Sequence, residues 1–239
     1  RQVTNEQRQN RPSGKVIPVN DQADVEVAEV LDGIVRHIEY MSDADVAYDT
    51  ACENQVTYGE GYIRILTEYC YEDSFDQDIK IARIRNSFSV YMDPLIQDPC
   101  GSDAEWCFIT EDLMKEEYER LYPDAAPLSS IMAQGIGDQD ISQWITDDTI
   151  RIAEYFYIEH TTDTLYLFPA NQTAFKGSQQ DKMFRAMGLL PVRERQVDRK
   201  KVKWCKTNGF EVLEERDWAG EWIPVVRVIG NEFQVDGRI

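Results

Sequence analysis

The chain has few of the residues and motifs that catalysis requires. Its 239 residues include only two histidines, His37 and His160, and neither has a nucleophile or a metal-ligand partner at motif spacing. No P-loop, dinucleotide-binding fingerprint or nucleophile elbow is present, and the Gly135-Ile136-Gly137 turn does not follow a predicted strand. These absences predict a protein that is not an enzyme and that binds no cofactor.

Long apolar runs and paired cysteines are missing as well. No run approaches the roughly eighteen apolar residues of a membrane-spanning helix, and residues 1–20 lack the apolar core of a signal peptide. The five cysteines are an odd set without a Cys-x-x-Cys pair or a histidine at ligand spacing, which fits neither a disulfide framework nor a zinc site. We expect a soluble, unsecreted protein with reduced thiols, and a bond between Cys100 and Cys107 stays open.

Positive charge is scarce relative to negative charge. The 44 acidic and 25 basic side chains give a formal net charge of -19. Such a field repels nucleic acid and argues against tight DNA binding, with the exception of a conduit that must let DNA slide past. Acidic pairs such as Glu111-Asp112 lack the loop pattern of a calcium site, and chance adjacency is expected in so acidic a chain. We therefore predict no metal site, while metal binding stays an alternative.

Hydrophobic periodicity predicts an α+β fold that begins with two helices. The first covers 24–41, and a second helix, capped by Ser42 or Asp43, runs to about Val56. The first helix is amphipathic, because its apolar residues recur at steps of three and four. This apolar stripe consists of Val27, Leu31, Ile34, Ile38 and Met41.

Alternating segments predict a mostly antiparallel set of strands after the helices. In the first half, Thr110 is the expected cap of a short acidic helix, and in the second half Thr207-Asn208-Gly209 is a strong hairpin signal. The predicted strands are a meander at 61–69, 79–85 and 88–91, followed by 105–110, 149–159, 164–168, 200–206, 210–215 and 222–228.

The expected domain organisation is simple. Residues 1–20 are polar, lack periodicity and predict an extended lead-in, and residues 21–239 form one α+β domain. A polar excursion at about 170–198, with a short helix near 181–187, lies outside the core. Because the chain begins at Arg1 instead of methionine and ends at Ile239 without a closing element, we expect it to be a piece of a longer polypeptide.

One basic run locally reverses the acidic character of the chain. Seven of the 25 basic residues fall within fourteen positions: Arg193, Arg195, Arg199, Lys200, Lys201, Lys203 and Lys206. Three interpretations stay open: the solvated face of a strand whose Val202 and Trp204 point inward, a contact to another subunit, or a contact to DNA phosphates. The candidate complementary acidic patch is Glu111, Asp112, Glu116, Glu117 and Glu119.

Several stretches, taken in order, carry a resemblance to a known family. They include Gly61-Tyr62-Ile63-Arg64, Ile84-Arg85-Asn86-Ser87-Phe88-Ser89-Val90-Tyr91-Met92-Asp93-Pro94, Phe108-Ile109-Thr110-Glu111-Asp112, Ile152-Ala153-Glu154-Tyr155-Phe156 and Trp222-Ile223-Pro224-Val225-Val226. Together they resemble the portal proteins of short-tailed enterobacterial bacteriophages, from about residue 21 to residue 238. Tyr58 and Glu60 depart from the expected glycine-rich turn, and the excursion at 170–198 has no counterpart in the family pattern.

The resemblance implies a structural role. The segment would be the N-terminal wing portion, the outer α+β body of a longer subunit, in a dodecameric ring at one capsid vertex of the virion, assembled in the host cytoplasm. Double-stranded DNA would be packaged and ejected through the ring, and the tail would attach to it. The implied partners are other copies of the chain, double-stranded DNA, a terminase that supplies the ATPase, a tail adaptor, and capsid and scaffolding proteins, with no membrane.

Two alternatives from other classes remain. One is a metal-dependent nuclease built on the acidic clusters, which magnesium-dependent DNA cleavage would reveal. The other is a non-portal phage adaptor that binds protein partners without forming a ring, which imaging of the complete protein would separate from a portal.

Overall fold

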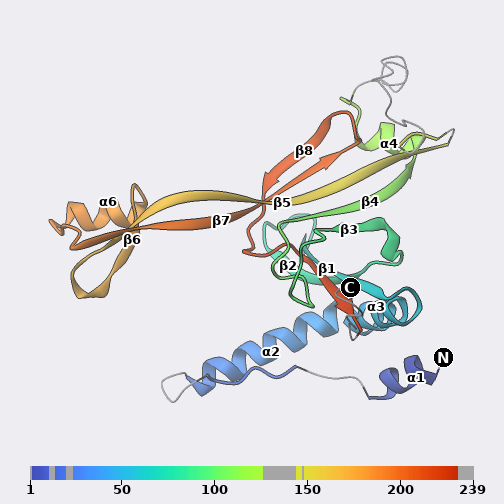
Figure 1. Ribbon diagram of the computed structural model, residues 1–239, viewed down its shortest axis with the longest axis horizontal. Coiled ribbons are helices and arrows are strands. Elements are labelled where there is room, and N and C mark those ends of the chain that lie inside the picture. Colours follow the sequence, from blue (N-terminus) through green and yellow to red (C-terminus); the bar gives the residue numbers. More distant parts are fainter. Residues whose placement is uncertain (1, 11–13, 20–23, 126–143, 147, 231–239) are drawn as a thin grey trace, which may run out of the picture.

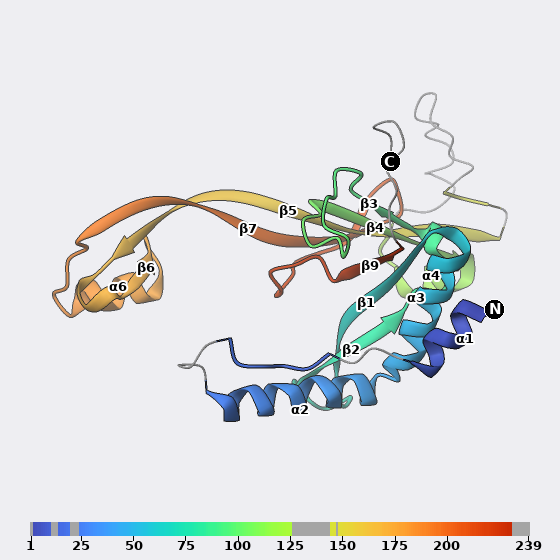
Figure 2. The ribbon, with the colours of Figure 1, turned by 60° about the horizontal axis from the view of Figure 1, so that its bottom comes forward.

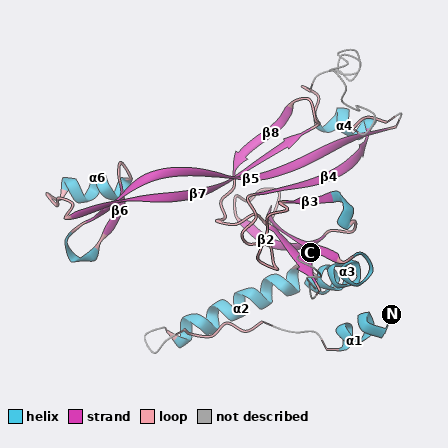
Figure 3. Cartoon of the chain, viewed as in Figure 1, coloured by secondary structure: helices cyan, strands magenta, loops and turns pink. Residues whose placement is uncertain are grey.

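The fold is an elongated α+β body from which a long two-stranded arm projects (Figure 1). The computed structural model describes residues 2–10, 14–19, 24–125, 144–146 and 148–230. In this part of the chain three helices come first and antiparallel strands with short helices follow, which confirms the predicted α+β class (Figure 3). The Gly135-Ile136-Gly137 turn lies outside the described residues.

The two predicted N-terminal helices are present. Helix α2 spans Val25–Met41 and is capped by the Asp24 carboxylate, which accepts a hydrogen bond from the Glu26 amide at 2.9 Å. Helix α3 spans Ala44–Tyr58 and ends at Gly59, whose φ of 94° suits a residue without a Cβ atom. The predicted apolar stripe of α2 is largely solvent-exposed, and Ala28 is the buried residue of this helix.

The extended lead-in is a wrong prediction over its first residues, because helix α1 spans Gln2–Gln9. This helix packs against α3, where the Arg8 guanidinium lies 3.5 Å from both the Asp49 and Glu53 carboxylates. The sequence of α1 has little helical periodicity of its own. Contacts with α3 therefore supply the order that the local sequence does not predict.

A three-stranded antiparallel sheet with the order β2-β1-β9 lies against α3. Its strands are β1 (Glu60–Tyr69), β2 (Gln77–Arg83) and β9 (Val225–Ile229). The predicted meander is correct for β1 and β2 but wrong for its third strand. The 3-10 turn η1 (Ser87–Ser89), capped by the Asn86 side chain, redirects the chain, so that β3 (Val90–Met92) joins the other sheet.

The larger antiparallel sheet has the order β3-β4-β5-β7-β8. After β3 it contains β4 (Trp106–Met114), β5 (Thr149–Leu167), β7 (Arg193–Thr207) and β8 (Val212–Asp217), and β6 (Thr173–Phe175) pairs with β5. The helix predicted after Thr110 begins later, as α4 (Lys115–Leu121), because β4 pairs with β5 as far as Met114 and Thr149.

The arm consists of the outer halves of β5 and β7. These strands pair without interruption from Ala153 and Thr207 to Leu167 and Arg193, and in the described residues other strands join the ladder at its two ends, β4 and β8 at the body and β6 at the tip (Figures 1 and 2). The sequence predicted shorter strands here, and an excursion at 170–198. The tip holds η3 (Pro169–Asn171), β6 and helix α6 (Gln179–Ala186), and α6 confirms the short helix predicted near 181–187.

Two buried clusters stabilise these parts separately. The main core lies between the two sheets and includes Tyr62, Cys107, Phe156 and Trp204. The arm tip has its own small core of Tyr166, Phe168, Ala174 and Phe184, so the prediction that residues 170–198 lie outside the core was wrong at Ala174 and Phe184. A two-stranded ribbon is marginally stable alone, and the tip core anchors its far end.

Candidate functional site

The basic run of β7 is largely paired with carboxylates of the same chain. Arg199 lies 2.9 Å from Asp163, and Lys200 lies 3.1 Å from Glu105. The Lys203 Nζ atom lies 2.5 Å from an Asp217 carboxylate oxygen, while Lys201 lies 3.9 Å from the other oxygen of that carboxylate. Val202 and Trp204 are buried between these cations, as the strand interpretation predicted.

Arg193 and Arg195 differ from the rest of the run. Both lie at the tip end of β7, opposite Leu167 and Leu165, and both are exposed. Among the described residues, no carboxylate forms an ion pair with either guanidinium. The seven basic residues therefore divide into a body-side group that is mostly neutralised and a tip pair that is not.

The acidic candidates come from two elements instead of one helix. Glu111 and Asp112 lie on β4, and the Arg151 guanidinium donates two hydrogen bonds, of 2.7 and 3.1 Å, to the Asp112 carboxylate. These hydrogen bonds hold the pKa of Asp112 below its usual value. The remaining members, Glu116, Glu117 and Glu119, lie exposed on α4.

His160 bridges three segments at the root of the arm. Its Nε2 atom lies 2.7 Å from Glu105 and its Nδ1 atom lies 3.2 Å from Asp198, while Lys200 contacts the same Glu105. The hydrogen bond to Glu105 and then that to Asp198 raise the pKa of His160. Because its neighbours are carboxylates and a lysine, and not a nucleophile, the arrangement is an electrostatic tether.

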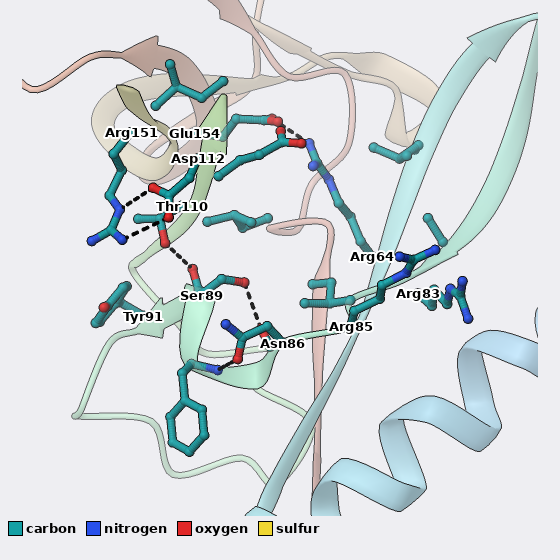
Figure 4. A pocket seen from close by; sticks show the side chains of 17 residues that line it. Arg64, Arg83, Arg85, Asn86, Ser89, Tyr91, Thr110, Asp112, Arg151 and Glu154 are labelled. Atoms are coloured by element: carbon teal, nitrogen blue, oxygen red, sulfur yellow. Dashed lines mark hydrogen bonds and ion pairs between the residues drawn. The ribbon is translucent and has the colours of Figure 1, made fainter. Parts of the chain in front are cut away.

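A pocket of about 470 Å³ lies between the two sheets (Figure 4). On one wall, Arg64 from β1 contacts the Glu154 carboxylate from β5, and Trp204 Nε1 donates to the same oxygen at 2.8 Å. Burial alone would raise the pKa of Glu154, but the charge and hydrogen bond of Arg64 bring it below its usual value. Arg64 and Glu154, and likewise Arg151 and Asp112, pair across or along the walls of this pocket, and the Arg64–Glu154 pair makes the pocket a joint between the two sheets (Figure 4).

Sequence reasoning missed both the tether and the joint. Glu105 and His160 are 55 residues apart, and Arg64 and Glu154 are 90 residues apart. No local motif links residues at such separations. The charged types were visible in the sequence, but their pairing depends on strand order.

Cysteine and metal chemistry have no site in the described residues. All five cysteines are free, which overturns the alternative of a Cys100–Cys107 bond. Cys107 lies in the main core, where burial raises the pKa of its thiol to about 12. No group of three or more histidine, cysteine or acidic side chains is arranged to hold a metal ion in the described ranges. Nor does any helix there have the length and apolar character needed to cross a bilayer.

Comparison with known proteins places the chain in a family. Residues 1–239 match the Phage P22-like portal protein family. The chain is also 27% identical over 247 residues to the portal protein of Acyrthosiphon pisum secondary endosymbiont phage 1. That alignment covers 98% of this chain and 34% of the relative, so the chain spans about a third of the relative's length. The chain belongs to the P22-like portal protein family.

Proposed function

We propose that this chain is the wing-like portion of a structural portal subunit. In the assembled particle, copies of the full polypeptide form a dodecameric ring at one capsid vertex, and double-stranded DNA enters and leaves through that ring. The observation that carries the proposal is the family match over the whole chain, residues 1–239. The domain 21–239 would then form the outer body of the ring, and the tail would attach to another part of the polypeptide.

The charge distribution supports a role as a conduit and not as a DNA-binding module. The net charge is -19, and carboxylates of the same chain pair with most of the basic run on β7. Phosphate contacts need unpaired cations whose counterions are released on binding. A surface that repels DNA lets the polyanion slide, which is what packaging and ejection require.

The proposal assigns no bond chemistry to this chain. A terminase would supply ATP hydrolysis, and the capsid, scaffolding and tail adaptor proteins would be the other partners. In support of this, His160 binds Glu105 and Asp198, and in the inter-sheet pocket Arg64 pairs with Glu154 and Arg151 with Asp112. Their contribution is to hold the arm and the sheets in fixed positions.

Native mass spectrometry of the full-length protein tests the proposal. We expect a closed oligomer of one defined size, and no cleavage of double-stranded DNA when the same sample is incubated with magnesium. A protein that stays monomeric at every concentration and ionic strength, or a magnesium-dependent nuclease activity that co-purifies with it, would overturn the proposal. A protein that is monomeric but captures phage proteins would favour the adaptor alternative.

The contact residues named from the sequence lead to a separate expectation. If the body-side basic run meets the acidic patch of a neighbouring copy, the triple variant R199E/K200E/K201E should lower the yield of closed rings. The ion pairs within the chain argue for a small effect, because these cations already have partners. Unchanged ring yield would exclude this run as the assembly contact and leave its role as a solvated strand face.

A further inference from the structure

The arm tip carries a basic and apolar surface that no other described part of the chain covers. Residues 173–196 contain five basic and two acidic side chains, in a chain whose net charge is -19. Helix α6 turns Phe184 into the tip core, so its other side faces solvent. The exposed side chains of this tip surface are Lys176, Lys182, Met183, Met187, Leu190, Val192, Arg193 and Arg195.

A pocket beside the tip arginines adds shape to this surface. It has a volume of about 380 Å³, and its lining residues are Leu165, Tyr166, Leu167, Thr173, Arg193, Glu194 and Arg195. An apolar floor with two unpaired guanidinium groups at its edge suits an apolar side chain that is flanked by carboxylates. Close by in the sequence, Met187, Leu190 and Val192 are 66%, 72% and 66% exposed, and exposed apolar side chains that gather in one region are typical of interaction sites.

Helix α2 has an exposed apolar stripe as well, but carries the opposite charge to the tip. It is the longest described helix, yet only Ala28 is buried. One stripe at helical spacing consists of Val27, Val30, Leu31 and Ile34, and each of these residues is about half exposed or more. Residues 24–41 contain five acidic side chains and one basic side chain. The apolar stripe of α2 is therefore flanked by carboxylates.

The two surfaces do not meet within one copy. The arm carries its tip away from the body, and α2 lies on another side of the molecule in both ribbon views (Figures 1 and 2). Between the body and the tip, from Ile158 to Thr164 of β5, the ladder of β5 and β7 has no further strand on either side among the described residues. The arm therefore projects away from the rest of the chain, and its exposed tip is available for contact with another molecule.

We propose that the arm tip of one copy docks on helix α2 of a second copy. This inference rests on the proposed ring and names the surfaces of one of its contacts. A patch that meets a different patch on the next copy is a heterologous contact, which closes into a ring when the rotation allows. Opposite charges set the register, and Met183 and Met187 adapt their flexible side chains to the α2 stripe.

A protein partner fits the tip better than nucleic acid does. Phosphate contacts require cations but make no use of the exposed Met187, Leu190 and Val192 side chains. Helix α2 offers negative charge to the basic groups of the tip and an apolar stripe to its apolar side chains. Capsid or scaffolding proteins and DNA are the competing occupants, and the experiments below identify them if they bind.

Charge reversal in the full-length protein tests the pairing. We expect R193E/R195E in the tip, and E26K/E29K in α2, each to lower the yield of rings about tenfold at fixed concentration. Combining all four changes should restore most of the yield. The matched control is R83E/R85E, two exposed arginines at the same spacing for which no ion pair exists among the described residues. Circular dichroism checks that every variant keeps its helices.

The outcomes separate this inference from the proposed function. Wild-type rings with unaffected tip variants would overturn the tip contact and leave the ring intact. If R193E/R195E loses rings and the quadruple variant that adds E26K/E29K does not recover them, the pairing with α2 is also overturned. If the wild-type protein itself never forms rings, the proposed function fails and takes this inference with it.

A photo-crosslinking amino acid at Leu190 identifies the occupant directly. We expect the crosslinked peptide in assembled particles to come from residues 25–41 of a second copy. Crosslinks to a capsid or scaffolding protein, to DNA, or to another region of this chain would overturn the assignment. The same amino acid at Phe75, which is 95% exposed on the body between β1 and β2, serves as the control and should not crosslink to α2 of another copy.

Discussion

Arg64 and Glu154 join the two sheets of this protein. Arg64 comes from the central strand of the small sheet, Glu154 comes from the longest strand of the large sheet, and Trp204 donates a hydrogen bond of 2.8 Å to the same carboxylate oxygen. Both side chains are mostly buried, with 19% and 14% of their surfaces exposed. The relationship fixes how the small sheet sits on the sheet that carries the arm.

Removing the Glu154 charge should destabilise the fold. Glu154→Gln leaves the mostly buried Arg64 guanidinium without a counter-charge, and we expect a loss of about 3 kcal/mol in the free energy of unfolding. Urea denaturation measures this loss in the free energy of unfolding. The control is Asp112→Asn, which removes the more exposed pair with Arg151 and should cost less than about 1 kcal/mol. Equal losses in the two variants would contradict the role of Arg64 and Glu154 as the joint.

A methyl group at Gly61 should disrupt the packing of α3 on β1. A Cβ atom there would lie 1.9 Å from the Ala51 carbonyl oxygen, and a backbone atom cannot rotate away. Gly61→Ala should therefore destabilise the protein by about 3 kcal/mol or more, measured by thermal or urea unfolding. Gly33→Ala in α2 is the matched control, because the added Cβ atom meets nothing within 4 Å. Since alanine favours a helix more than glycine does, this variant should be more stable by about 0.5–1 kcal/mol.

The His160 tether should depend on pH. Its pKa is raised above the usual 6.5, so the folded chain binds this proton more tightly than the unfolded chain. The stabilisation is complete below about pH 6.5 and is lost as pH rises through the higher folded pKa. An NMR titration of the His160 ring should give a midpoint above 6.5, and E105Q/D198N should move it back down. A midpoint that is unchanged in the double variant would exclude the tether.

The thiols should differ sharply in reactivity. Cys107 is fully buried and its pKa is raised to about 12, so little thiolate forms at neutral pH, whereas Cys100 is exposed. A thiol reagent should label Cys100 in the native protein and should reach Cys107 only after denaturation. In the Cys100→Ser variant the rapid labelling of the native protein that is due to Cys100 should disappear. Rapid labelling of Cys107 in the native state would show that the core between the sheets opens readily.

Local signals in the sequence predicted the parts of the fold that short-range chemistry determines. Asp24 caps α2 and Gly59 ends α3, in agreement with capping rules, and α3 follows Asp43 as predicted, although the Asp43 side chain makes no cap hydrogen bond. The Asn208-Gly209 turn joins β7 to β8, with Gly209 at a φ of 88°, although β8 begins at Val212 instead of residue 210. The inward positions of Val202 and Trp204 followed from alternation along the strand.

Other parts depend on contacts that the sequence pattern does not encode. Helix α1 has no apolar stripe and is ordered by Arg8 on α3. Glu111 and Asp112 looked helical because they are acidic and follow Thr110, but pairing with β5 extends β4 through them. The third strand of the small sheet is β9, which pairs with β1 although more than 150 residues separate the two strands in the sequence. Strand order, and with it the Arg64–Glu154 pair, is a tertiary property.

Cryo-electron microscopy of the full-length protein is the most direct measurement of the central claim. The account predicts a closed ring in which this chain forms the outer body, with the arm tip of each copy seated on α2 of another copy. Solitary particles under every assembly condition, or particles whose symmetry leaves no central passage wide enough for double-stranded DNA, would contradict it.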